Sequence, residues 1–241
     1  MKGTILQPTY LPWIGYFDMI DIADIYVVFD DVQFSKKSWQ QRNYIKTKQG
    51  ALMLSLSISK AKLTTSIKDI KIFDNKKILE NHWKTISLAY KKSTYFEKYK
   101  KLFENIYSKN YIFLRDFNLD IIKLVCEIIG IKSSFVNSSD IIIKKNYNDM
   151  TKKIIQLCDS VGITTLYDAH GASKILDINV INESNIDFKF QNLNHPSYNQ
   201  LYGKFIPYMS VIDLIFNEGP KSLSIIREGR KFQNYRDLNT R

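Results

Sequence analysis

Two short apolar segments near the N-terminus, each ending abruptly in polar residues, constrain the fold of this chain more than any other feature. Residues 4–6 and 25–29 are β-branched, aliphatic or aromatic and too short for helices, so both are predicted to be buried parallel strands. Between them, residues 13–23 carry apolar side chains at helical spacing, and Pro8 and Pro12 fix the turn that enters this helix. The sequence therefore predicts a Rossmann-like βαβ unit at the N-terminus.

Polar side chains follow both predicted strands at the point where each strand ends. Gln7 and Tyr10 follow the first strand, and Asp30, Asp31 and Gln33 follow the second. In open parallel sheets, ligands bind outside the carboxyl ends of the strands, so we expect these side chains to converge on a binding site. The alternative is a plain βαβ unit whose loops are merely polar.

The loop after the second strand carries residue types that suit a phosphorylated sugar or nucleotide. Arg42 offers a planar, permanently charged ligand for phosphate. Trp39 can stack on the face of a sugar or a base, and Asn43 adds hydrogen-bonding groups beside them. This crowding of binding side chains exceeds what solubility requires of a loop, and it favours a site over the plain alternative.

The rest of the chain predicts a helical middle and a C-terminal α/β segment. Residues 42–47 and 51–58 form an expected hairpin, because the second run alternates apolar and polar residues after a turn at Gly50. Weak alternation over residues 67–72 predicts an edge strand. The other expected elements are helices at 75–90, 95–107, 110–129, 149–160, 210–216 and 222–229, strands at 133–136, 164–167 and 187–191, and a polar tail at 230–241.

The length and composition favour one globular unit, residues 1–241, whose most plausible internal boundary lies near residues 131–147. A chain of 241 residues buries a proper core. It has no run of 18 apolar residues and no signal sequence at its start, so we expect a cytoplasmic protein without a transmembrane segment. Cys126 and Cys158 lie in apolar helical segments, which predicts buried free thiols.

The chain is basic, with 35 Lys and Arg against 24 Asp and Glu, a net charge of +11. Such a charge attracts nucleic acid, anionic membranes and polyanionic substrates. Two partners that it suits are a nucleotide-linked sugar and a tRNA. The lysines are scattered rather than clustered, however, so a coding bias that fills neutral surface with Lys is an equally simple explanation.

Two histidines in predicted loops are the candidate general bases. A neutral imidazole can take a proton from an amine near neutral pH. His170 follows a predicted strand, and His195 precedes Pro196; for each, the alternative is a structural histidine bonded to backbone. Asp30 or Asp31 can orient the amine or, as carboxylates, suit Mg²⁺, whereas the three distant histidines argue against zinc.

Several sequence motifs of known chemistry do not occur in this chain. It has neither of the glycine-rich phosphate motifs GxGxxG and GxxxxGK[ST]. It also lacks the GxSxG motif, so acyl transfer through a serine nucleophile is unsupported. The motifs thus specify no cofactor, no metal and no acyl donor.

Three long runs together resemble the WbqC-like family. They are Gln7-Pro8-x-Tyr10-Leu11-Pro12-Trp13-x-Gly15-Tyr16-Phe17, then Asp30-Asp31-Val32-Gln33-Phe34 with Trp39-Gln40-x-Arg42-Asn43, and finally Tyr198-x-Gln200 through Phe205-x-Pro207-x-x-Ser210-x-x-Asp213-x-x-x-Asn217-x-Gly219. The resemblance extends from Gly3 to about Gly219, nearly the whole chain.

The resemblance implies a role in bacterial surface-polysaccharide synthesis, because members of this family are associated with O-antigen gene clusters. It implies a transferase that moves glycine or another small acyl group to the amine of a nucleotide-linked amino sugar. A non-catalytic binding or assembly protein of the same pathway and an aminoacyl-tRNA-dependent transferase are the alternatives; the oligomeric state stays open. The candidate catalytic residues are His170, Asp31 and Asp30, and the candidate substrate-binding residues are Gln7, Tyr10, Gln33, Trp39, Arg42, Asn43, His195, Tyr198 and Gln200.

The opening unit is also faintly similar to nucleotidylyltransferases with a Rossmann-like fold. Their HxGH phosphate motif is absent, and Pro12-Trp13-x-Gly15-Tyr16 stands in its place. This difference argues against adenylyl transfer as the reaction and leaves the fold expectation intact.

Overall fold

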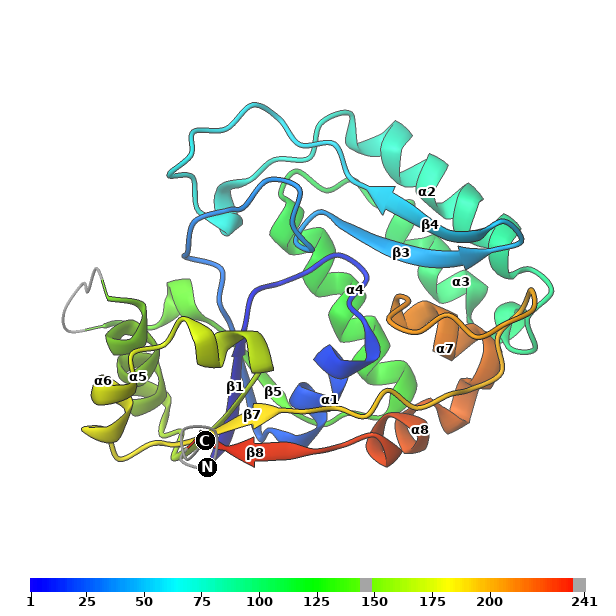
Figure 1. Cartoon of the computed structure of the whole chain (residues 1–241). Helices are drawn as coiled ribbons and strands as arrows, with labels where there is room; N and C mark the ends of the chain where they lie inside the picture. The colour runs from blue at the N-terminus through cyan, green and yellow to red at the C-terminus, as the bar shows by residue number, and fades with distance from the viewer. Residues whose placement is uncertain (144–148, 236–241) are drawn as a thin grey trace.

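The computed structural model describes residues 1–143 and 149–235, and a six-stranded sheet forms one half of this part of the chain (Figure 1). The strand order is β5-β2-β1-β6-β7-β8. These strands are β1 (Lys2–Leu6), β2 (Ile25–Val28), β5 (Ser134–Asn137), β6 (Thr165–Asp168), β7 (Asp187–Gln191) and β8 (Phe232–Asn234). All pairs are parallel except β7–β8. The order reverses between β1 and β6, which makes this a Rossmann-like sheet and confirms the predicted α/β class.

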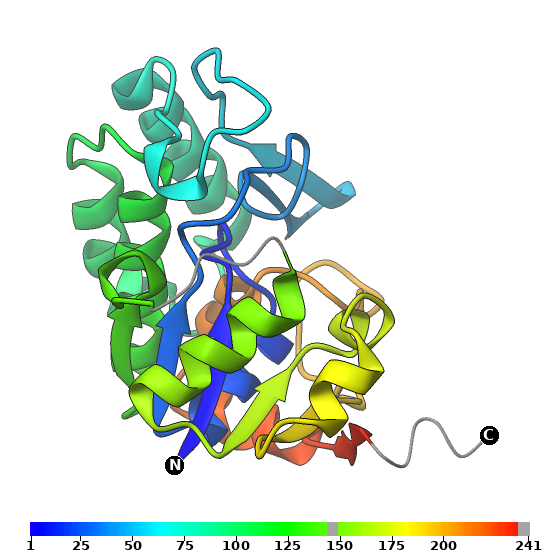
Figure 2. The same ribbon diagram turned by 90° about the vertical axis from the view of Figure 1, so that its left-hand side faces the viewer.

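Helices cover both faces of this sheet. Helix α1 (Ile14–Ile22) packs on one face together with α8 (Ser222–Glu228). Helix α5 (Met150–Val161) lies over the opposite face, in front of β1 in Figure 2, with the short α6 (Ile178–Asn182) beside it. The strands are therefore buried on both sides, which explains why β1 and β2 read as continuous apolar runs.

The other half of the described chain is a β-hairpin backed by helices, and it lies above the carboxyl ends of the parallel strands (Figure 1). The hairpin pairs β3 (Arg42–Thr47) with β4 (Gly50–Ser55). Helices α2 (Asn75–Tyr90), α3 (Phe96–Tyr107) and α4 (Leu114–Ile129) pack beside one another, and α2 contacts β3. Helix α7 (Val211–Glu218) contacts β3 and α3 from the C-terminal part of the chain.

The helix ends follow local sequence signals. Asp149 caps α5, because its carboxylate accepts hydrogen bonds from the backbone N–H groups of Thr151 and Lys152. Helix α4 ends at Gly130 and α5 at Gly162, and both glycines adopt the left-handed conformation that terminates a helix. Cys126 and Cys158 are buried free thiols, as the sequence predicts.

Two sequence-based expectations differ from the structure. Residues 67–72 contain a short 3₁₀ helix, η1 (Ile67–Asp69), flanked by isolated bridges, so the expected edge strand is wrong. The expected polar tail contains β8, which pairs with the edge of the sheet. Three residues are too few to give an alternating pattern, and residues 236–241 lie outside the described part of the chain. The predicted boundary near 131–147 falls on β5, η2 (Ser138–Asp140) and residues 144–148, the last of which are also not described.

Candidate functional site

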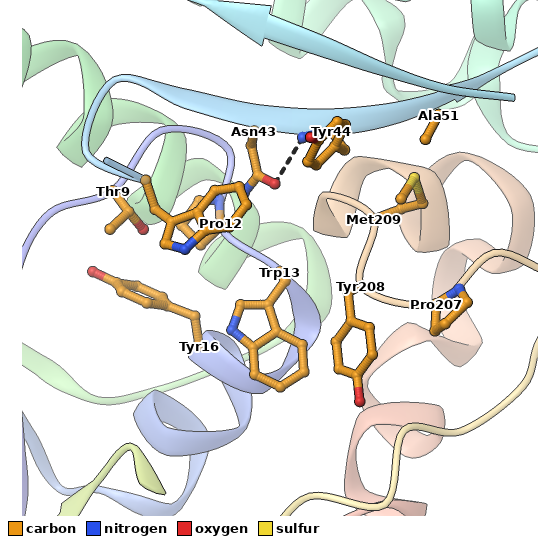
Figure 3. Close-up of a pocket in the computed structure, with 11 residues that line it drawn as sticks. Thr9, Pro12, Trp13, Tyr16, Asn43, Tyr44, Ala51, Pro207, Tyr208 and Met209 are labelled. Atoms are coloured by element: carbon orange, nitrogen blue, oxygen red, sulfur yellow. Dashed lines mark hydrogen bonds between the residues drawn. The ribbon is translucent and has the colours of Figure 1, made fainter. Parts of the chain in front are cut away.

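An aromatic pocket of about 500 Å³ lies above the carboxyl end of β1 (Figure 3). Three parts of the chain form it: the loop from β1 into α1, the hairpin with the loop that precedes it, and the segment that leads into α7. The lining residues are Thr9, Pro12, Trp13, Tyr16, Trp39, Asn43, Tyr44, Ala51, Pro207, Tyr208 and Met209. None of these is an acid, a lysine, an arginine, a cysteine or a histidine, so the walls are predominantly apolar and aromatic.

The hairpin holds the loop that forms the floor of the pocket. Asn43 is buried, and its Nδ2 donates to the carbonyl oxygens of Leu11 at 2.8 Å and Tyr10 at 3.3 Å. The backbone N–H of Tyr10 donates to the carbonyl oxygen of Trp39 at 2.9 Å. Leu11 adopts a positive φ of 45°, a conformation that needs such external support. The predicted binding residue Asn43 thus lines the pocket and also fixes its backbone.

Trp13 forms one wall of the pocket at the start of α1. A Cβ atom at Gly15 would lie 2.3 Å from the Trp13 ring, so the absence of a side chain there allows the indole to lie over the first turn of the helix. Trp13 also stacks on the imidazole of His195, with ring centroids 6.1 Å apart. His195 therefore packs against Trp13 and is not one of the residues that line the pocket.

Arg42 lies beside the pocket on the same hairpin. Side chains two residues apart on a strand share a face, so Arg42 projects on the face that carries Tyr44. Its Nε is buried and has no hydrogen-bond partner within residues 1–143 and 149–235. A buried donor without a partner is costly, and an anionic ligand would supply the missing acceptor. Trp39, 54% exposed, lies near the Tyr44 ring at 6.2 Å between centroids.

Both candidate aspartates are already paired with cations. Asp30 is fully buried, and its carboxylate accepts from Arg115 Nη1 at 2.7 Å and from the backbone of Ser139 at 3.1 Å. Asp31 accepts from Lys153 Nζ at 2.7 Å and from Ser138 Oγ at 2.5 Å. Neither aspartate lines the pocket. They fasten the end of β2 to α4, α5 and the segment after β5.

Three other candidates lie outside the pocket lining. Gln7 follows β1, and its Oε1 accepts from Gln40 Nε2 at 2.7 Å. Gln33 is exposed and forms an isolated bridge with Ser66. His170 is exposed at the start of η3 (His170–Lys174), directly after β6. Because β6 is the neighbour of β1, His170 and Gln7 lie at the same edge of the sheet.

Tyr10 lies in the core rather than in the pocket. Its hydroxyl is hydrogen bonded to His82 Nδ1 at 2.8 Å and to the Tyr107 hydroxyl at 2.9 Å. Burial raises the pKa of Tyr10 well above its usual value, and it lowers the pKa of His82 to about 4. This cluster ties the loop after β1 to α2 and α3.

Tyr198 and Gln200, two further candidates, bind the buried carboxylate of Asp213 in α7. The Tyr198 hydroxyl donates to Asp213 Oδ2 at 2.9 Å, and Gln200 Nε2 donates to the same atom at 2.7 Å. Gln200 Oε1 in turn accepts from Lys46 Nζ at 3.0 Å. Tyr90 donates to the other carboxylate oxygen at 3.0 Å. The network joins β3, α2 and the segment that carries Tyr208, so these residues shape the pocket indirectly.

Tyr44, Pro207, Tyr208 and Met209 line the pocket but are not among the binding residues predicted from the sequence. Pro207 belongs to the quoted C-terminal run, and the two residues after it could have been found as its neighbours.

Asp168, at the last position of β6, is a buried acid that was not predicted as a site residue from the sequence. Asp168 Oδ1 accepts from the N–H of Ala169 at 2.7 Å, and burial raises its pKa to about 7. A carboxyl group whose pKa lies near neutrality at the end of a strand beside the topological switch point is a candidate for proton transfer.

Within residues 1–143 and 149–235, no group of three or more His, Cys, Asp or Glu side chains is arranged to hold a metal ion. Among the helices described there, none is long and apolar enough to cross a membrane.

Comparison with known proteins connects this geometry to a family. The sequence pattern of the WbqC-like protein family matches residues 7–225, which include every residue that lines the pocket. The chain is 28% identical over 233 residues to the Mycobacterium tuberculosis (strain ATCC 25618 / H37Rv) protein named "Uncharacterized protein Rv1507c", covering 95% of this chain and 99% of that protein. No solved structure matches significantly. The chain belongs to the WbqC-like protein family.

Proposed function

We propose that this protein is a transferase of bacterial surface-polysaccharide synthesis that moves a small acyl or aminoacyl group to the amine of a nucleotide-linked amino sugar. The observation that supports it most is the aromatic pocket above the carboxyl end of β1. The association of WbqC-like proteins with O-antigen gene clusters suggests the pathway.

The pocket suits the ring of a sugar. Its volume of about 500 Å³ is within the range of small-ligand sites, and aromatic faces pack well against the C–H faces of a pyranose. Trp39 and Tyr44 supply such faces from the hairpin and the loop that precedes it, and Tyr208 supplies one from the segment before α7. Thr9 and Asn43 add a hydroxyl and an amide to the lining.

The phosphate groups of such a substrate would bind beside the pocket. Arg42 shares a strand face with Tyr44, and its buried Nε lacks an acceptor within the described residues. A diphosphate would satisfy this donor and the guanidinium charge together. The proposal therefore places the sugar among the aromatic rings and the diphosphate at Arg42.

The reaction requires a neutral amine and a base. The amine nitrogen would attack the carbonyl carbon of an activated acyl ester or thioester, forming the C–N bond. The bond to the leaving group breaks and its electron pair leaves with that group, while the base accepts the proton from nitrogen. No carboxylate lines the pocket to hold the amine as ammonium, and an apolar site favours the neutral form.

His170 is the proposed base, because it lies at the sheet edge beside the end of β1. Asp30 and Asp31 are neutralised by Arg115 and Lys153, so the proposal gives them the role of holding the loops rather than orienting the amine.

Binding is tested first by calorimetry with UDP-glucosamine, UDP-N-acetylglucosamine and UDP-glucose. We expect at least one amino sugar nucleotide to bind, and Trp39→Ala to raise its dissociation constant at least tenfold. Leu88→Ala is the matched control, since Leu88 is 57% exposed on α2 and does not line the pocket. Arg42→Met should abolish the difference in affinity between the nucleotide-linked sugar and the free sugar. Equal affinity of wild type and Trp39→Ala would contradict the proposed site.

A binding or assembly protein of the same pathway is the second candidate. It is favoured by the absence of any imidazole or carboxylate among the residues that line the pocket. Transfer of a radiolabelled acyl group from an activated ester or thioester separates the two functions. Product formation that is lost in His170→Ala supports the transferase, whereas tight binding without product, unchanged in that variant, supports the binding protein.

A further inference from the structure

His195 contacts the segment that forms the outer wall of the pocket, although it does not line the pocket itself. The backbone N–H of Tyr208 donates to His195 Nε2 at 3.0 Å. His195 Nδ1 lies 2.9 Å from the carbonyl oxygen of Pro196. Since the first contact requires a lone pair on Nε2, the proton of the neutral ring is on Nδ1, which donates to Pro196.

Tyr208 needs this support because its backbone is strained. Its φ is 61°, in the left-handed region that non-glycine residues rarely adopt. Its ring packs against His195 at 4.9 Å and against Trp13 at 5.4 Å between centroids. One face of this arrangement is the pocket wall in Figure 3, where the Trp13 ring lies between the rings of Tyr16 and Tyr208. The position of Tyr208 thus depends on an acceptor supplied by His195.

Protonation of the imidazole would remove that acceptor. A doubly protonated ring would direct an Nε2–H group at the N–H of Tyr208, so the hydrogen bond would be replaced by repulsion. Three rings face the imidazole: Trp13 from the loop before α1, and Phe205 and Tyr208 from the segment before α7. Of these three, only Tyr208 carries an ionisable group, and none of the ion pairs within residues 1–143 and 149–235 includes His195.

We infer that His195 is a positioning residue that holds Tyr208 in the wall of the pocket only while its imidazole is neutral, and that protonation releases Tyr208 and opens the pocket. Burial lowers the pKa of His195, although its contact with the Pro196 carbonyl acts in the opposite direction. Tyr208 therefore stays in the pocket wall at neutral pH and is released in acid. This inference goes beyond the proposed function and needs no assumption about the substrate.

The test follows the Tyr208 amide by ¹H–¹⁵N NMR from pH 7.5 down to the pH at which the His195 ring signals, recorded in the same samples, show a fully protonated imidazole. We expect the Tyr208 amide proton to move upfield with the same midpoint as the His195 ring. His195→Gln is the critical variant, because the Oε1 atom of glutamine can accept the bond and does not titrate. In this variant the Tyr208 amide should stay unchanged over the whole range.

Opening of the pocket is measured by acrylamide quenching of tryptophan fluorescence in a Trp39→Phe background, which removes the tryptophan that is already exposed. Between pH 7.5 and the pH at which the NMR signals show His195 protonated, we expect the quenching constant to rise at least twofold with His195 and less than 1.2-fold with His195→Gln. If His195 titrates in the wild-type protein and the Tyr208 amide does not respond, that result alone overturns the inference. An equal rise in quenching in both proteins would overturn it as well. Neither measurement contains a sugar nucleotide, so either result is independent of the proposed function.

Discussion

His82 shows how one buried side chain carries a pH-dependent part of the stability. Its ring is 6% exposed, Nδ1 bonds the Tyr10 hydroxyl, and burial lowers its pKa to about 4. An unfolded histidine titrates near 6.5, so between pH 6.5 and 4 the unfolded chain binds more protons than the native protein. Stability from this residue is present above pH 6.5 and is lost as the pH falls toward 4.

His82→Asn removes this titration while leaving an oxygen that can accept from Tyr10. We expect the variant to have a lower free energy of unfolding than wild type at pH 7.5. This gap between the two proteins should be about 2 kcal/mol smaller at pH 5. Urea unfolding at the two pH values measures the gap. A gap of constant size would show that His82 titrates normally in the native protein.

Asp168 changes the stability with pH in the opposite direction to His82. Its pKa is raised to about 7 by burial, and an unfolded aspartate titrates near 3.8, so between these values the native protein binds more protons than the unfolded chain. The stability it contributes is present below pH 3.8 and is lost as the pH rises through 7. Asp168→Asn mimics the protonated acid, and we expect its stability relative to wild type to increase by about 2.5 kcal/mol from pH 5 to pH 8. Urea unfolding at both values checks this, and a relative stability that falls with pH contradicts it.

The sequence predicted residue types at the site better than individual roles. Trp39 and Asn43, two of the predicted binding residues, line the pocket, whereas Tyr10 and Tyr198 direct their hydroxyls into buried networks. A tyrosine in a loop motif has the same pattern whether its hydroxyl faces a ligand or a buried partner. The partners, His82 and Asp213, lie 72 and 15 residues away along the chain, so only the fold brings them together.

At the level of elements, the start of α1 is shaped by a contact that requires glycine. Gly15→Ala would place a methyl group 2.3 Å from the Trp13 ring, so the indole must move from its position in the pocket wall. We expect this variant to weaken binding of the amino sugar nucleotide at least fivefold with only a small change in melting temperature. Gly171→Ala is the matched control, because nothing lies within 4 Å of its added Cβ. Equal affinity of both variants would exclude Trp13 from the binding wall.

The end of β2 is attached to α4 by the Arg115–Asp30 ion pair, whose aspartate is fully buried. Removal of one partner leaves an uncompensated buried charge, so Arg115→Met should lower the free energy of unfolding by about 3 kcal/mol. Lys109→Met breaks an exposed pair with Asp120 and should cost less than about 1 kcal/mol. Urea denaturation measures both. Similar small losses would show that the Arg115–Asp30 ion pair does not hold the end of β2 to α4.

Elements with internal periodicity were predictable, and those defined by distant partners were not. The parallel strands β1 and β2 and the amphipathic helices α2 to α4 follow from their apolar spacing. Strand β8 has three residues and exists because β7 offers an unpaired edge. To predict the pocket, the hairpin must be placed over the carboxyl ends of the parallel strands. No local sequence pattern specifies that placement.

At the scale of the whole molecule, the net charge of +11 bears on the choice of acyl donor. A basic surface binds tRNA through its phosphates, releases counterions and loses affinity steeply with salt, whether or not the tRNA carries an amino acid. An enzyme that uses aminoacyl-tRNA as donor must in addition recognise the ester-linked amino acid. The scattered lysines suit binding to tRNA phosphates. The pocket lining has no charged side chain and gives no indication that it recognises an ester-linked amino acid.

We therefore expect glycyl-tRNA and deacylated tRNA to bind with affinities within threefold of each other, both falling at least tenfold between 50 and 200 mM salt. Filter binding with both forms of the same tRNA, at both salt concentrations, measures the two effects separately. A preference of tenfold or more for glycyl-tRNA that persists at 200 mM salt would contradict a charge-only interaction and identify tRNA as the donor. With no such preference, the positive charge acts on phosphate in general, and the acyl group comes from a smaller activated ester or thioester.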